Sequence, residues 1–188
     1  MNTKEFFNAV AEKWDANEPY TREQIQSFLL SCGLQGNKRT LDLGCGTGII
    51  SDILLEAGCA VTALDLSEKM IEAAKKKHAG KDIRFVCGDF YSFSESGFEQ
   101  VVLFNAYPHF LDRAAFVKKL ASVLSEGGTF LIAHNIGREA LSRHHSGVRD
   151  ISRELLPVLE ESKDFSSSFT ILSARETENS YLIRGQKK

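Results

Sequence analysis

The chain has 188 residues, of which 43% are hydrophobic and 26% charged, and its formal net charge is −2. This composition supports a packed core, and the length is typical of one domain, so we expect a single domain over residues 1–188. Because the chain has no basic excess, a nucleic-acid-binding surface is not expected. The sequence contains no apolar run near the ~20 residues that span a bilayer, no secretory signal, and no C-x-x-C pair among its four cysteines. It therefore predicts a reduced, cytoplasmic protein without membrane contact.

The first part of the chain, residues 1–38, is predicted to be helical. A helix over residues 3–14 would place its apolar side chains on one stripe. A second helix starts near Thr21, where Thr21 and Gln24 have the spacing of a capping box, and it ends at Gly33.

Short apolar runs and amphipathic segments then alternate along the chain. Strands are predicted at residues 40–44, 60–65, 83–87, 100–104 and 129–134, and helices at residues 47–57, 68–77 and 112–124. Strands such as residues 101–104 are apolar on both faces, which is typical of a parallel sheet that helices cover on both sides. The sequence therefore predicts a doubly wound, Rossmann-like α/β fold.

The C-terminal part has a different pattern. Residues 151–162 are predicted to be helical, with Pro157 starting a new turn or kinking the helix. Two strand-like runs follow at residues 168–175 and 179–185, and their short connection permits only an antiparallel hairpin. We expect seven strands in a mostly parallel sheet, of which the last is antiparallel. The pair Gly127-Gly128 is expected to form the turn before the fifth strand.

A glycine-rich turn is the strongest functional signal in the sequence. Gly44, Gly46 and Gly48 follow a strand and precede a helix, so the backbone can turn sharply and a ligand can approach it closely. Asp65 ends the next strand and could accept hydrogen bonds from both hydroxyls of a ribose. A plain tight turn and a nicotinamide dinucleotide site are the alternatives, but dinucleotide sites usually have the spacing G-x-G-x-x-G.

The ordered segments DLGCGTG, ALDLSEKM, CGDF and LSEGGTFLIA make the sequence similar to a known family. They resemble the motifs of class I S-adenosylmethionine-dependent methyltransferases, in particular the quinone-methylase-like branch of small bacterial methyltransferase domains. The resemblance covers roughly residues 5–134. It implies that residues 1–38 form a cap over the cofactor and that S-adenosylmethionine is converted to S-adenosylhomocysteine.

The resemblance also implies a cofactor role for particular residues. The three glycines would wrap the amino-acid portion, Asp42 would hold its amino group, and Asp65 would bind the ribose. Asp89 would bind the adenine amino group, while Trp14 would close over the site or simply pack in the core. The complete set of expected cofactor-binding residues is Asp42, Gly44, Cys45, Gly46, Gly48, Asp65, Leu66, Met70, Asp89, Phe90, Asn105 and Trp14. Cys45 is expected to be a small wall residue, with a redox role as the alternative.

The residues after the fourth and fifth strands are the candidates for catalysis. We select His109, His134, His145 and Arg138 because the carboxyl ends of neighbouring parallel strands meet at one edge of the sheet. The histidines could act as a general base or orient the acceptor, bind a transition metal, or have a structural role. Arg138 could bind a carboxylate or phosphate of the acceptor, or form a local salt bridge.

The nature of the acceptor follows from two features of the sequence. The segment Asn105-Ala106-Tyr107-Pro108 lacks the Asn-Pro-Pro-Tyr pattern of many nucleic-acid base methylases, although Tyr107 could line the pocket or stack on an acceptor. Only the N-terminal helices and residues 135–163 remain to shape a substrate pocket. We therefore expect a small-molecule methyl acceptor and no nucleic acid, and we select no metal ligand. A non-catalytic cofactor- or metal-binding module is the alternative, and the oligomeric state stays open.

Overall fold

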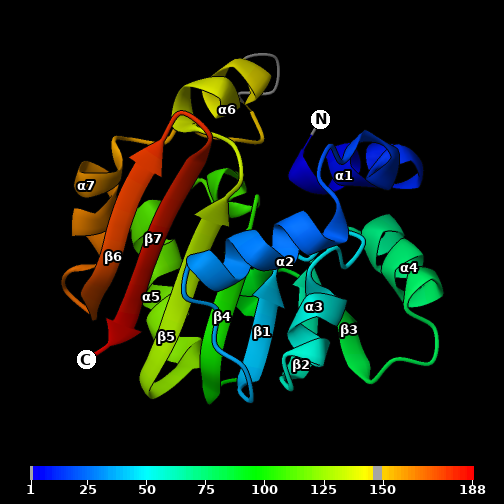
Figure 1. Cartoon of the computed structure of the whole chain (residues 1–188), viewed down its shortest axis with the longest axis horizontal. Coiled ribbons are helices and arrows are strands. Elements are labelled where there is room, and N and C mark those ends of the chain that lie inside the picture. The colour runs from blue at the N-terminus through cyan, green and yellow to red at the C-terminus, as the bar shows by residue number, and fades with distance from the viewer. Residues whose placement is uncertain (1, 146–149) are drawn as a thin grey trace.

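The computed structural model describes residues 2–145 and 150–188, apart from the side chains of residues 17, 144 and 145. Its centre is a seven-stranded sheet with the strand order β3-β2-β1-β4-β5-β7-β6 and with helices on both faces (Figure 1). The strands are β1 (Arg39–Leu43), β2 (Ala60–Asp65), β3 (Ile83–Cys87), β4 (Phe98–Phe104), β5 (Leu124–His134), β6 (Phe169–Thr177) and β7 (Ser180–Lys187).

The topology confirms the predicted doubly wound α/β fold. Strands β3, β2, β1, β4 and β5 pair in parallel, and β7 pairs antiparallel with both β5 and β6. The order reverses at β1, because β2 and β3 lie on one side of it and β4 and β5 on the other (Figure 1). In such sheets, the crevice beyond the carboxyl ends of the strands at this reversal is where ligands bind.

Seven α-helices are found in the described part of the chain. They are α1 (Thr3–Val10), α2 (Arg22–Ser31), α3 (Ser51–Glu56), α4 (Glu68–Lys77), α5 (Arg113–Val123), α6 (Arg138–His145) and α7 (Val158–Glu161). Thr21 and Gln24 form the predicted capping box at the start of α2. A second capping box, between Asn2 and Glu5, starts α1.

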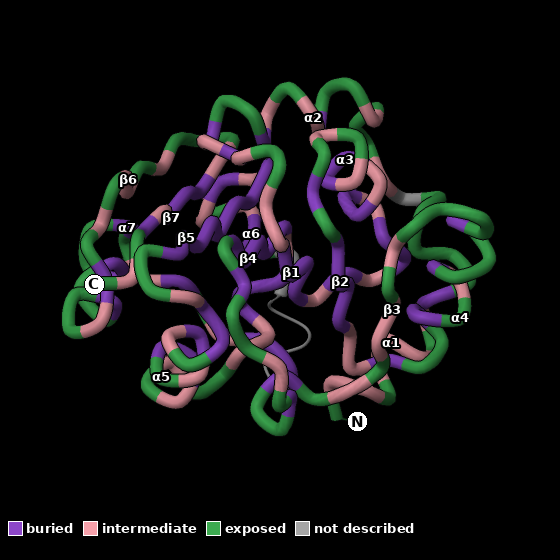
Figure 2. Tube along the Cα trace, turned by 90° about the horizontal axis from the view of Figure 1, so that it is seen from below, coloured by how far each residue is buried: buried purple, intermediate pink, exposed green. Residues whose placement is uncertain are grey.

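The strands in the middle of the sheet bury both of their faces. In β4, Val101 and Leu103 pack against α5 and α7, whereas Val102 and Phe104 pack against α2 and α3. Figure 2 shows the same arrangement as a buried sheet surrounded by helices whose outer faces are exposed. The two-sided apolar pattern in the sequence was therefore a correct indication of a covered sheet.

Several predicted helix boundaries were wrong near the N-terminus and the glycine turn. The first helix ends at Val10 and continues as two 3₁₀ turns, η1 (Ala11–Lys13) and η2 (Asp15–Asn17). The third helix begins at Ser51 instead of residue 47, because Gly48 has a positive φ of 78° that a helix cannot contain.

The prediction of a helix over residues 151–162 was wrong for its first half. Residues 150–157 contain no helix or strand, and α7 begins only after Pro157, whose φ and ψ of −48° and 138° are extended. A residue that precedes proline is disfavoured in the helical region, so Leu156 cannot easily continue a helix into Pro157. The Gly127-Gly128 turn was also wrong, because β5 runs continuously past it with a bulge opposite β4, in which Gly127 has a φ of 70°.

Candidate active site

A cavity of about 950 Å³ lies at the carboxyl ends of β1, β2 and β4, beneath the N-terminal segment. Small-molecule sites usually enclose ~300–1,000 Å³, so the cavity can hold a cofactor together with a small second molecule. Ten of the twelve residues predicted to bind the cofactor line it. They are Trp14, Gly44, Cys45, Gly46, Asp65, Leu66, Met70, Asp89, Phe90 and Asn105.

The glycine turn forms one wall of the cavity. Gly44 and Gly46 have positive φ angles of 70° and 54°, which side chains other than glycine rarely adopt. A Cβ atom on Gly44 would also lie 2.7 Å from the Cβ of Ala106. A Cβ atom on Gly46 would meet nothing closer than Trp14 Nε1 at 3.7 Å, so this part of the backbone faces open space that a ligand can occupy.

The third glycine has a different role from the one the sequence suggested. Gly48 is not among the described residues that line the cavity. A Cβ atom at this position would lie 2.9 Å from Nε2 of His78 and 3.2 Å from the ring of Phe85. Gly48 therefore allows the turn to pack closely against the end of α4 and against β3.

Asp65 joins the glycine turn to the end of β2. Its Oδ2 accepts a hydrogen bond from the backbone N–H of Gly46 at 2.8 Å, and its Oδ1 accepts one from the N–H of Ser67 at 2.9 Å. Burial raises the pKa of Asp65, and these backbone donors counteract part of that shift. Each carboxylate oxygen has a further lone pair, so the group can still accept two hydrogen bonds from a ligand such as a ribose.

The N-terminal segment is held over this cavity by polar contacts with both ends of α4 and with the glycine turn. Oδ1 of Asn8 accepts a hydrogen bond from Oγ of Ser67 at 2.7 Å. Asp15 accepts hydrogen bonds from Nζ of Lys77 at 2.8 Å and from the hydroxyl of Thr47. Trp14 remains 40% exposed while it lines the cavity, which contradicts the alternative that it packs in the core.

His109 lies in the cavity wall on the side of β4. It ends the 3₁₀ turn η4 (Tyr107–His109), and its ring meets that of Phe7 edge-on, with the centroids 4.9 Å apart. Its Nδ1 is 3.0 Å from the carbonyl oxygen of Ile151, which can only accept, so Nδ1 carries the proton. Burial lowers the pKa of His109 from its usual value. The imidazole is therefore neutral at pH 7, with Nε2 as its basic nitrogen.

Two asparagines that follow neighbouring strands also line the cavity. Asn105 follows β4 with a positive φ of 54°, and its Nδ2 donates to Oδ1 of Asn135 at 2.8 Å. The backbone N–H of Asn135 donates in return to Oδ1 of Asn105 at 3.3 Å. Asn135 was missed by the sequence analysis, although its position directly after the fifth strand was a signal that could have identified it.

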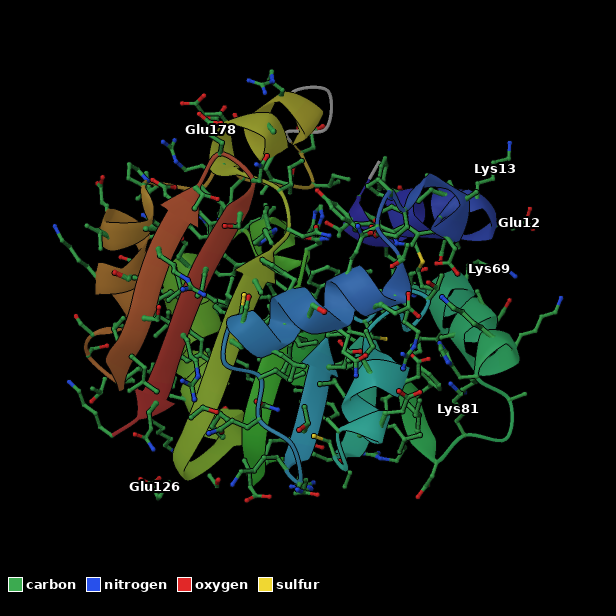
Figure 3. The ribbon with its side chains drawn as sticks, viewed as in Figure 1. Glu12, Lys13, Lys69, Lys81, Glu126 and Glu178 are labelled. Carbon is green, nitrogen blue, oxygen red and sulfur yellow. The ribbon has the colours of Figure 1, made fainter. Side chains whose placement is uncertain are left out.

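The other predicted catalytic residues do not join His109. His134, the last residue of β5, is fully buried and packs edge-on against Tyr181 with the rings 6.1 Å apart. Arg138 forms the alternative salt bridge, with Glu176 at 3.1 Å, in a separate hollow between α6 and the β6–β7 turn that carries Glu178 (Figure 3). The side chain of His145 lies outside the described part of the chain. The predicted grouping of His109, His134 and Arg138 was therefore wrong.

Two further expectations can be compared with the described residues. Tyr107 does not line the cavity, because it is completely buried and its hydroxyl donates to Glu161 at 2.8 Å. Among the side chains that the structure describes, which leave out those of residues 144 and 145, no three His, Cys, Asp or Glu residues are close enough to hold a metal ion. The metal-binding interpretation of the histidines therefore has no supporting group in this part of the chain.

Comparison with known proteins shows which protein family the chain belongs to. Residues 41–132 match a family model described as a methyltransferase domain. The ubiquinone biosynthesis O-methyltransferase of Xanthomonas campestris is 30% identical over 172 residues, which cover 85% of this chain and 72% of that protein. The chain belongs to the class I S-adenosylmethionine-dependent methyltransferases. S-adenosylmethionine is the cofactor of this family, as the sequence motifs implied.

Other relatives of this chain differ in size and in the reaction that their names state. The malonyl-[acyl-carrier protein] O-methyltransferase of Priestia megaterium is 30% identical over 149 residues, or 76% of this chain and 54% of that protein. The chain thus spans about half the length of that relative. The PH0226 protein of Pyrococcus horikoshii superimposes with a TM-score of 0.74 at 23% identity, over 98% of this chain and 99% of that one, which shows a shared fold.

A chain from the complex between the Haloferax volcanii Trm112 methyltransferase activator and a putative methyltransferase has the same fold as this chain. The TM-score is 0.82 at 17% identity, over 96% of this chain and 97% of that one. Among the described residues, none of the helices has both the length and the apolar character that crossing a membrane requires.

Asp42 lies behind the cavity wall and is not among the described residues that line it. Its Oδ2 accepts a hydrogen bond from Oγ of Ser51 at 2.6 Å. Complete burial raises the pKa of Asp42 from 3.8 to about 7, a shift that the Ser51 bond partly opposes. The folded chain therefore holds this proton up to about pH 7, whereas the unfolded chain loses it near pH 3.8.

The titration of Asp42 predicts how stability depends on pH. Between pH 3.8 and about 7 the folded state binds more protons than the unfolded state, so the free energy of unfolding falls as the pH rises, by up to about 4 kcal/mol. Asp42→Asn retains an oxygen that accepts the Ser51 bond and removes the titration, so its stability is expected to fall less over this range. Urea unfolding at about pH 4 and about pH 8 measures the effect, and an equal decline in both proteins contradicts it.

Proposed function

We propose that this methyltransferase transfers a methyl group to a small, mainly apolar acceptor that binds in the same cavity as the cofactor. The observation that carries this proposal is that the glycine turn, Asp65 and His109 all line the same cavity of about 950 Å³. We further propose that residues 1–188 act as one domain in which residues 1–38 form the cap over this cavity and residues 135–163 contribute part of the acceptor pocket.

The proposed cofactor contacts follow from the geometry of the cavity wall. Asp65 would accept hydrogen bonds from the ribose hydroxyls, because each of its oxygens has a lone pair beyond its backbone bond. Gly44 and Gly46 present a backbone without side chains to the amino-acid portion. The adenine would lie between Leu66, Met70 and Phe90, with Asp89 at its amino group. Asp42 would act on the cofactor's amino group from behind the wall, through water.

The chemistry of the cavity wall as a whole indicates the class of acceptor. Aromatic and aliphatic side chains form most of it, among them Phe6, Phe7, Tyr20, Phe104, Phe110, Leu111, Ile136 and Leu141. The charged residues of the wall are Asp15, Glu18, Asp65, Asp89 and Asp112, and among the described residues no Lys or Arg lines it. Such a wall favours an uncharged or cationic apolar acceptor and disfavours a carboxylate or phosphate.

His109 is the proposed general base for an acceptor that must lose a proton, such as a phenol. The Ile151 carbonyl holds the proton of the ring on Nδ1, so Nε2 can take up a proton. Bound S-adenosylmethionine supplies an electrophilic methyl group, and the wall positions the nucleophile and excludes water. A phenolic hydroxyl is consistent with the Xanthomonas campestris relative, whose name refers to ubiquinone biosynthesis and O-methylation.

Calorimetry followed by a turnover assay tests the proposal. S-adenosylmethionine and S-adenosylhomocysteine are expected to bind with one site per chain, and methyl transfer is expected to phenols or amines in preference to their carboxylic acid analogues. Saturable cofactor binding without transfer to any member of a panel of these three acceptor classes would instead indicate a non-catalytic cofactor-binding module. Preferred transfer to carboxylic acids would contradict the argument from the charges of the wall.

A further inference from the structure

The segment between α6 and α7 includes a partly buried strap, which we define as residues 150–157. The strap contains no helix or strand, yet Ile151 is only 3% and Leu155 only 6% exposed. It runs along η4, where the backbone N–H of Arg153 donates to the carbonyl of Pro108 at 3.0 Å. The carbonyl of Ile151 accepts the bond from Nδ1 of His109. The strap therefore supplies the group that determines the tautomer of His109.

Two charged side chains hold the strap in this position. Glu161 of α7 is completely buried, and its Oε1 accepts hydrogen bonds from Nη2 of Arg153 at 2.6 Å and from the hydroxyl of Tyr107 at 2.8 Å. Its Oε2 accepts the backbone N–H of Leu156 at 3.0 Å, and Arg113 lies 3.8 Å from the same atom. The carboxylate thereby ties both the strap and η4 to α7.

The guanidinium of Arg153 reaches the two residues that flank Pro108 and His109 in the sequence. Its Nε donates to the carbonyl of Phe110 at 3.1 Å, and its central carbon lies 4.5 Å from the centre of the Tyr107 ring. A planar guanidinium can donate in two directions and stack on an aromatic ring at the same time, which a lysine cannot do. One side chain thus contacts the backbone that follows His109 and the aromatic ring two residues before it.

We propose that Arg153 and Glu161 are positioning residues for His109. They hold the strap against η4, so that the Ile151 carbonyl orients the imidazole of His109. This hydrogen bond keeps the proton of the ring on Nδ1 and leaves Nε2 as the basic nitrogen. This inference rests on the proposed role of His109 in methyl transfer. A buried ion pair is an inefficient way to stabilise a core, because an apolar pair of similar volume is often as stable, so its contacts on both sides of His109 suggest a role in orientation.

A double variant separates positioning from stability. Arg153→Met combined with Glu161→Met removes both charges together, so no buried charge is left without a partner and the chain is expected to fold. We expect ¹⁵N NMR shifts of the His109 ring to lose the strong preference for a proton on Nδ1, and kcat to fall by at least about tenfold with KM for S-adenosylmethionine unchanged. Lys38→Met with Glu99→Met, which removes an ion pair at the opposite end of the sheet, is the matched control.

Arg153→Lys provides a second variant that keeps the charge pair. Lysine can still pair with Glu161 but cannot also bond to Phe110 and stack on Tyr107, so we expect a shift of the tautomer towards a mixture. An unchanged tautomer and an unchanged kcat in the folded double variant would overturn the inference. The ring shifts are measured without cofactor or acceptor. A changed tautomer in a protein that shows no turnover would therefore support the positioning role and contradict only the proposed function.

Discussion

Asp65→Ala is expected to weaken the binding of S-adenosylhomocysteine by about 100-fold. The carboxylate of Asp65 is the group proposed to accept both ribose hydroxyls, and two hydrogen bonds to a charged acceptor contribute ~3 kcal/mol together. The same side chain accepts the N–H groups of Gly46 and Ser67, so part of the loss could come from a loosened glycine turn. Calorimetric titration of the wild-type and variant proteins measures the total effect.

A second ligand distinguishes the direct contact from the loosened turn. The 2′-deoxy analogue of S-adenosylhomocysteine lacks one hydroxyl, so it is expected to lose clearly less affinity than the parent compound when Asp65 is replaced. Asp82→Ala is the matched control, because Asp82 is an exposed aspartate just before β3, at the opposite end of that strand from the cavity. Equal losses for both ligands would contradict a direct contact between Asp65 and the ribose.

His109→Asn is expected to lower kcat for a phenolic acceptor by about 100-fold or more, the usual effect of losing a general base. The Asn amide can still donate to the Ile151 carbonyl in place of Nδ1, but it has no nitrogen that accepts a proton. Cofactor affinity is expected to stay unchanged, because His109 lies on the side of the cavity formed after β4.

The pH profile provides the independent check on His109. In the wild-type protein kcat should fall as the pH drops through the lowered pKa of His109, since protonated imidazole cannot accept a proton. In His109→Asn this decline is expected to disappear, leaving a rate that rises only with ionisation of the acceptor itself. The same decline in both proteins, or full activity of the variant at neutral pH, would show that His109 is not the base.

The fold could be predicted because local sequence pattern and global architecture agree. Residues 101–104 are apolar on both faces, and the strand that contains them is buried on both faces. The glycine turn and Asp65 were found for a related reason: backbone geometry at residues 44–48 requires glycine, and this requirement is visible in the sequence. The first half of the helix predicted over residues 151–162 is absent, because Arg153 and Glu161 hold that backbone through contacts with residues about 50 positions earlier.

The sequence alone did not predict which of the residues after β4 and β5 lie in the cavity. The prediction placed His109 and His134 at one edge of the sheet, but His134 is still part of β5 and therefore points to a face of the sheet, beneath Tyr181. Asn105 and Asn135 instead come after the last residues of β4 and β5, and both line the cavity. Whether a side chain lies in the core or in the cavity thus depends on whether its residue is the last of the strand or the first after it. The exact end of a strand cannot be read from the periodicity of the sequence.

A crystal structure with bound S-adenosylhomocysteine tests the central claim most directly. The account predicts that the ligand occupies the cavity beneath residues 1–38, with both ribose hydroxyls within hydrogen-bond distance of Asp65 and with its sulfur on the side of His109. A ligand bound outside this cavity would contradict the account. So would a ligand whose ribose makes no contact with Asp65, or whose sulfur points away from His109.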